Sequence, residues 1–134
     1  MRSLFALALL CTALGVGCGD DAGPESEQTQ FPDVIGATAT MADDGSWSVS
    51  ATISSPYETA DRYADAWRIL GPDGEALGVR ELLHDHAGEQ PFTRTLAGVE
   101  IEDRVESVVI EGRDLLSGWG GASFVLALDR TTAN

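Results

Sequence analysis

A strict two-residue alternation is the feature that most constrains how this chain can fold. Four apolar residues alternate with serine and threonine in one short segment: Trp47, Val49, Ala51 and Ile53. Successive side chains of a β-strand point to opposite faces, so this spacing predicts a strand with one buried and one solvent-exposed face. An amphipathic helix would instead need a period of about 3.6 residues. Positions 35–41 alternate in the same way, and Asp43-Asp44-Gly45 between the two segments is typical of a tight turn. The pattern predicts a β-hairpin.

The rest of the chain consists of similar short apolar segments separated by turn residues, of which Gly71-Pro72-Asp73-Gly74 is the clearest. The seven expected strands are 35–41, 47–53, 66–70, 76–83, 92–96, 105–113 and 122–128. This spacing predicts an all-β, seven-stranded antiparallel sandwich of the immunoglobulin or fibronectin III-like kind, with a small antiparallel barrel as the alternative. Trp67 fits the buried tryptophan of the third strand. Since no inter-sheet cysteine pair is present, the fibronectin III-like form is favoured.

The first 17 residues have the features of an export signal rather than of a folded segment. Arg2 precedes a run of 13 uncharged residues, Leu4 to Val16. That run is too short for a membrane span of about 20 residues, but it fits the apolar region of a signal peptide. With Gly17-Cys18 and two acids shortly after it, the segment resembles a bacterial lipoprotein signal. The resemblance implies cleavage before Cys18 and acylation of its thiol.

The position before the expected cleavage site leaves an alternative open. Lipoprotein signals usually carry leucine where this chain has Gly15, so cleavage after Gly15 or Gly17 and release of a soluble periplasmic or secreted protein is the second interpretation. If Cys18 is acylated, the chain is held at a lipid bilayer, because each buried methylene contributes about 0.8 kcal/mol and two acyl chains bind far more firmly than one. The expected location is therefore the cell envelope, outside the cytoplasm.

Composition changes sharply after Cys18. Positions 19–30 hold four acids, with glycine and proline and no aliphatic residue larger than alanine, which predicts a flexible linker. The expected organisation is a signal peptide at 1–17, the lipidated cysteine with an acidic linker at 18–31, a β-sandwich domain at 32–130 and a frayed tail at 131–134.

Charge limits the classes of partner. The chain has 22 acidic residues against 8 basic ones, all arginine, and a formal net charge of −14. Nucleic acid is excluded as a partner, because phosphate binding needs a basic face. The expected partners are the bilayer, through Cys18, and an unknown envelope protein or glycan.

No catalytic arrangement is recognisable in the sequence. There is no Gly-x-Ser-x-Gly motif, and a lipidated Cys18 leaves no thiol nucleophile in the exported chain. We therefore expect a non-catalytic binding or interaction module; a small hydrolase is a further alternative.

Several motifs carry a resemblance to a known group of proteins. They include Tyr63-Ala64-Asp65-Ala66-Trp67, Leu82-Leu83-His84-Asp85-His86 and Glu89-Gln90-Pro91-Phe92-Thr93-Arg94. Through them, residues 63–121 resemble small exported bacterial proteins of uncharacterised activity. The resemblance implies an exported β domain and assigns no chemistry.

His84-Asp85-His86 holds both histidines of the chain. Residues i and i+2 of an extended segment point to the same side, so the two imidazoles could share copper or zinc, with Glu81, Asp85 or Glu89 adding an oxygen ligand. A divalent metal is the one cofactor that the sequence suggests. The favoured interpretation is a structural loop in which the imidazoles bond to backbone or pair with acids. A third interpretation is a pH-sensitive contact.

A second candidate site surrounds Trp119. Residues 115–121 are expected to form a glycine-rich loop, which could display the indole for ligand binding beside Arg113 and Asp114. The favoured interpretation is that Trp119 caps the core.

Two further expectations concern charged residues. Glu58, with Asp61 and Asp65, is expected to lie in a solvated acidic connection. Three strand arginines are expected to pair with acids across strands: Arg68, Arg80 and Arg94.

Overall fold

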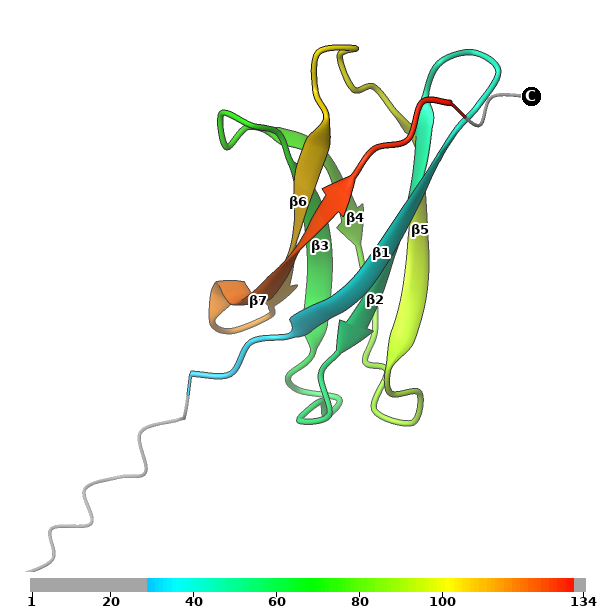
Figure 1. Ribbon diagram of the computed structural model, residues 1–134. Helices are drawn as coiled ribbons and strands as arrows, with labels where there is room; N and C mark the ends of the chain where they lie inside the picture. Colours follow the sequence, from blue (N-terminus) through cyan, green and yellow to red (C-terminus); the bar gives the residue numbers. More distant parts are fainter. Residues whose placement is uncertain (1–28, 132–134) are drawn as a thin grey trace, which may run out of the picture.

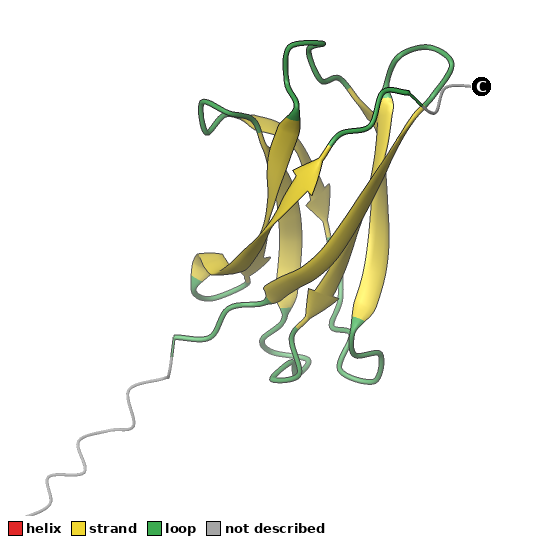
Figure 2. Ribbon diagram, in the orientation of Figure 1, coloured by secondary structure: helices red, strands yellow, loops and turns green. Residues whose placement is uncertain are grey.

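The computed structural model describes residues 29–131, which form two β-sheets packed face to face (Figures 1 and 2). The strands are β1 (Asp33–Met41), β2 (Trp47–Ser54), β3 (Ala64–Leu70), β4 (Ala76–Glu81), β5 (Phe92–Val99), β6 (Ser107–Asp114) and β7 (Gly118–Ala127). The expected signal peptide, Cys18 and nearly all of the expected linker and tail lie outside the described residues. Between positions 29 and 131, no helix is long and apolar enough to cross a membrane.

The strand order confirms the predicted sandwich. One sheet has the order β1-β2-β5 and the other has the order β4-β3-β6-β7, with every neighbouring pair antiparallel. In an immunoglobulin constant-type domain the fourth strand joins the sheet of the first two strands. Here β4 pairs with β3 instead, in keeping with the fibronectin III-like expectation. Because the strands of the described part fall into two separate sheets, the barrel alternative is wrong.

The core lies between the two sheets. Trp67 on β3 is fully buried, which confirms the predicted position of the buried tryptophan, and Trp47 on β2 of the other sheet has no exposed surface either. The apolar members of the alternating segment 47–53 are all buried, and their serine and threonine neighbours are not. Burial of these residues is the main favourable contribution to folding.

The glycine-rich segment differs from its prediction. β7 begins at Gly118, so the expected loop 115–121 is only a three-residue turn, 115–117. Gly120 pairs with Gly112 of β6, and Trp119 pairs with Arg113. The β4 strand also ends earlier than predicted, at Glu81 rather than Leu83.

These glycines make room for the segment that leads into β1. A Cβ atom on Gly120 would lie 2.6 Å from the Phe31 ring, and one on Gly112 would lie 2.7 Å from the Pro32 ring. Gly121 has a φ of +84°, and a side chain there would also collide with the Pro32 carbonyl oxygen. We call this contact the Phe31–Pro32 clasp. It packs residues 31–32 against β6 and β7 because the glycines have no side chains.

The sandwich has two different ends (Figure 1). The proximal end contains the start of β1 with the loops 55–63 and 82–91. The distal end contains the turns 42–46 and 71–75 and the loop 100–106. The predicted histidine motif lies at the proximal end.

Candidate functional site

The structure brings the two histidines together. Their ring centroids are 4.7 Å apart. His84 is exposed, whereas His86 is 5% exposed and stacks on Phe92 at a centroid distance of 4.0 Å. Phe92 is the first residue of β5 and is itself buried in the core. His86 is therefore held rigidly, and His84 lies over it at the surface.

The carboxylates expected to complete a metal site are engaged elsewhere. Glu81 accepts a hydrogen bond from Arg113 at 3.3 Å, and Glu89 accepts one from Arg94 at 3.0 Å. The hydrogen bond from Arg94 lowers the pKa of Glu89. Within residues 29–131, no group of three or more histidine, cysteine, aspartate or glutamate side chains is placed to hold a metal ion. The geometry thus supplies two adjacent imidazoles without a third ligand from this part of the chain.

The surroundings of His86 favour its neutral form over the imidazolium. Burial lowers its pKa, and the nearby Arg94 guanidinium lowers it further, while Glu58 acts in the opposite direction. The Nδ1 atom of His86 is buried and has no hydrogen-bond partner among the described residues. An unpartnered buried polar atom is uncommon in a folded domain and asks for an explanation.

A cavity of about 160 Å³ lies beside the histidines. Its lining includes Arg80 and Arg94 as well as both imidazoles. Arg80 makes no hydrogen bond or ion pair with any described residue, and its Nε atom is buried without a partner. The predicted cross-strand pair of Arg80 is therefore wrong. The pair predicted for Arg68 is confirmed, since Arg68 on β3 contacts Glu111 on β6 at 2.6 Å. Arg94 on β5 pairs with Glu89 of the preceding loop rather than with an acid on a neighbouring strand.

Trp119 lies on the outer face of the four-stranded sheet. The Arg68 guanidinium carbon is 4.0 Å from the indole centroid, and that of Arg113 is 5.1 Å from it. Cation–π contacts of this kind contribute about 0.5–1 kcal/mol each at exposed sites. Trp119 is partly exposed and is absent from the side chains that pack on the core, so the interpretation that it caps the core is wrong. The arginines instead fix the indole at the surface.

Asp114 is separated from Arg113 and Trp119. It is 1% exposed and accepts hydrogen bonds from the Tyr57 hydroxyl at 2.9 Å and from the Ser117 N–H at 2.8 Å. Arg62 Nε lies 3.3 Å from Asp114 and forms an ion pair with it. Adjacent residues of a strand face opposite sides, which explains why Arg113 reaches the surface while Asp114 is buried. In this structure Asp114 stabilises the 115–117 turn and the 55–63 loop.

Glu58 differs from the expectation of a solvated carboxylate. It is 5% exposed and accepts hydrogen bonds from Ser55 Oγ at 2.7 Å, from Gln90 Nε2 at 2.7 Å and from the Ala64 N–H at 3.0 Å. Gln90 also donates to the His86 carbonyl oxygen at 3.1 Å. This network joins the two proximal loops and fixes the backbone beneath the histidines. Sequence reasoning missed it because the amide partner lies 32 positions away.

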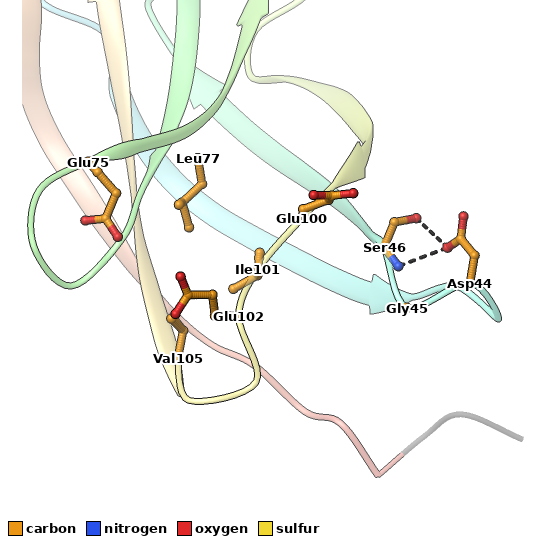
Figure 3. Close-up of a pocket in the computed structure, with 9 residues that line it drawn as sticks. All are labelled: Asp44, Gly45, Ser46, Glu75, Leu77, Glu100, Ile101, Glu102 and Val105. Carbon is orange, nitrogen blue, oxygen red and sulfur yellow. Dashed lines mark hydrogen bonds between the residues drawn. The ribbon is translucent and has the colours of Figure 1, made fainter.

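A second cavity, of about 510 Å³, opens at the distal end (Figure 3). Four acids line it from three separate turns: Asp44, Glu75, Glu100 and Glu102. Figure 3 shows Leu77 and Ile101 between Glu75 on one side and Asp44 on the other. Asp44 accepts two hydrogen bonds from Ser46, and Glu102 pairs with Arg104 at 2.6 Å. The sequence analysis placed Asp44 in a turn but did not connect it with the other three acids, because only the fold brings these segments together.

Comparison with known proteins gives one informative likeness. The chain is 34% identical over 93 residues to a protein named "Putative lipoprotein" from Halomicrobium mukohataei. The aligned region covers 69% of this chain and 45% of that relative, so the chain spans less than half the length of the protein it matches. No family model matches the chain. No solved structure matches it.

Proposed function

We propose that this chain is an exported lipoprotein, anchored through an acylated Cys18, whose β-sandwich is a non-catalytic binding module of the cell envelope. Two independent observations support the anchor. The segment 1–21 resembles a lipoprotein signal, and the archaeal relative carries the name of a lipoprotein. The motifs of residues 63–121 resemble those of small exported bacterial proteins, and this likeness also favours export of the chain.

The observation that carries the binding role is the position of Trp119. Its partly exposed indole lies on a strand of the four-stranded sheet, in contact with the guanidinium groups of Arg68 and Arg113. Both arginines are themselves held by carboxylates, Glu111 at 2.6 Å and Asp65 at 2.8 Å. Preordered tryptophan and arginine side chains are enriched at the residues that contribute most to binding. The proposed ligand of this face is an envelope protein or glycan.

Replacement of Cys18 by alanine is expected to release the protein from membranes, because the acyl chains supply the anchoring free energy. Membrane fractionation and metabolic labelling with a fatty acid measure this directly. A Cys11→Ala variant is the matched control and is expected to stay in the membrane fraction with its label. Unchanged fractionation of the Cys18→Ala protein would contradict the anchor.

The binding proposal has its own test. Trp119→Ala is expected to abolish at least 90% of the capture of an envelope component that the wild-type protein retains from solubilised native envelopes, with a loss of stability of about 1 kcal/mol from the two cation–π contacts. Leu116→Ala, which truncates another exposed apolar side chain at 61% exposure, is the control and is expected to retain capture. Equal capture by both variants would remove Trp119 from the binding face.

Metal handling is the second candidate function, and the 4.7 Å separation of the imidazoles favours it. It requires a further ligand from a partner or from solvent, because both neighbouring glutamates are in ion pairs with arginines. Zinc titration of the wild-type protein beside a His84→Ala/His86→Ala variant tests it, and equal zinc binding by both proteins would contradict it.

A further inference from the structure

Arg80 stands apart from the other arginines of residues 29–131. Each of the other six forms an ion pair with at least one carboxylate: Arg62, Arg68, Arg94, Arg104, Arg113 and Arg130. Arg80 forms none with the described residues, although the chain contains 22 acids. A partly buried guanidinium without a partner is costly, because burial removes water from the charge and nothing replaces it.

A cavity beside Arg80 leaves space for a bound partner. Arg80 lies on β4 directly opposite Trp67 of β3, so its stem packs at the edge of the sandwich. Its side chain lines the 160 Å³ cavity together with Arg94 and the two histidines. Leu82, Leu83 and Glu81, whose carboxylate is paired with Arg113, complete the lining. The cavity is thus a small recess that combines hydrogen-bond donors with an apolar side.

The acids near this cavity do not neutralise Arg80. Glu81 is paired with Arg113, and Glu89 is paired with Arg94. Asp85 accepts a hydrogen bond from the Ala87 N–H at 3.2 Å, and the buried Glu58 is used by the loop network. His86 Nδ1 and Arg80 Nε are both buried without a partner among the described residues, so neither atom faces the open space of the recess. The guanidinium of Arg80 is a hydrogen-bond donor only, and its unpaired charge beside the recess points to a bound group with acceptor oxygens.

We propose that this recess binds the carboxylate of a small molecule, with the Arg80 guanidinium as its principal contact and the two imidazoles beside it. Guanidinium binds a carboxylate through two parallel hydrogen bonds. The volume equals that of about five water molecules, which suits a carboxylate and a few carbon atoms. In a protein of formal net charge −14, repulsion grows with the charge of the ligand, so a monoanion is favoured over a phosphate dianion. This site does not depend on the lipid anchor or on Trp119.

Acetate is the probe for the test. Sodium acetate is titrated into the full-length protein, carrying ¹³C-labelled histidine, at constant pH and ionic strength, and the imidazole NMR signals are followed. We expect saturable shifts of the His84 and His86 signals with a dissociation constant in the millimolar range. Arg80→Gln is expected to weaken acetate binding at least tenfold. Arg104→Gln, which removes an arginine at the distal end, is the matched control and leaves the affinity unchanged.

A folding defect is separated from a binding defect by two further measurements. Arg80→Gln should keep the thermal midpoint of the wild-type protein, because Arg80 makes no hydrogen bond in the described structure. Arg80→Lys keeps the charge without the planar fork and is expected to show intermediate affinity.

Three outcomes would overturn the proposal. The first is the absence of saturable shifts with acetate, or equal acetate affinity in Arg80→Gln and the wild-type protein. The second is tighter binding of inorganic phosphate than of acetate, which would replace the carboxylate with a phosphate. The third is stoichiometric binding of zinc to both imidazoles in a protein that does not bind acetate, which would establish the metal function instead.

Discussion

Replacement of Asp114 by alanine is expected to lower the free energy of unfolding by about 3–5 kcal/mol. The Asp114 carboxylate is fully buried and accepts hydrogen bonds from two backbone N–H groups, of Leu116 and Ser117. It also accepts one from the Tyr57 hydroxyl and forms the ion pair with Arg62. Its removal leaves these donors unsatisfied inside the protein, which costs more than the net value of any one bond. Urea unfolding followed by circular dichroism measures the difference.

Asp129→Ala is the matched control for this substitution. Asp129 is exposed and, among residues 29–131, accepts hydrogen bonds from Thr131 only, so its loss is expected to cost about 0.5 kcal/mol or less. A similar decrease in the free energy of unfolding in the two variants would show that the buried hydrogen bonds of Asp114 add no more stability than an exposed pair.

The same network makes part of the stability depend on pH. Burial raises the pKa of Asp114, but hydrogen bonds from the Ser117 N–H, the Tyr57 hydroxyl and Arg62 outweigh burial and hold the pKa below its ordinary value of 3.8. A carboxyl whose pKa is lower in the folded state stabilises the fold above its unfolded pKa, and this contribution is lost as the pH falls through the folded pKa. The stability difference between wild type and Asp114→Ala should therefore shrink below about pH 4.

Gly121→Ala is expected to destabilise the fold by about 3 kcal/mol. A φ of +84° costs an L-residue about 1–2 kcal/mol, and the new methyl group must also displace the Pro32 backbone, at a further cost of about 1–3 kcal/mol. Thermal and urea unfolding of the two proteins give the difference.

Gly45→Ala is the matched control, because it has the same backbone cost as Gly121→Ala but lies away from the Phe31–Pro32 clasp. Gly45 has a φ of +86°, and nothing lies within 4 Å of an added Cβ atom, so only the backbone cost of about 1–2 kcal/mol remains. An equal loss in Gly45→Ala and Gly121→Ala would mean that the Phe31–Pro32 clasp does not stabilise the domain.

The strands were predictable where burial alone decides the pattern. Segment 47–53 alternates because one face meets the core, and β2 occupies Trp47–Ser54 as a result. The start of β7 was not predictable in this way. Gly118-Trp119-Gly120-Gly121 has the local composition of a loop, yet Gly120 and Gly121 are accommodated in a strand because residues 31–32, almost 90 positions earlier, pack on them. A tertiary contact thus overrides the local preference.

The candidate sites show the same division between local and distant information. The proximity of His84 and His86 follows from their i, i+2 spacing, and the sequence analysis predicted it correctly. The missing partner of Arg80 depends on which acid the sheet register places nearby, and the nearest acids are engaged by Arg94 and Arg113. Glu58 was misjudged for the same reason, because its burial depends on Gln90 in another loop.

The Phe31–Pro32 clasp also sets the place at which the chain leaves the domain toward Cys18. It fixes the exit of the chain at the end of the sandwich that holds the loops 55–63 and 82–91 (Figure 1). Cys18 lies only 11 residues before Thr29, a span of at most about 40 Å when fully stretched. If Cys18 is acylated, the recess beside Arg80 therefore lies at the end of the domain nearest the attachment point, and the acid-lined cavity lies at the opposite end.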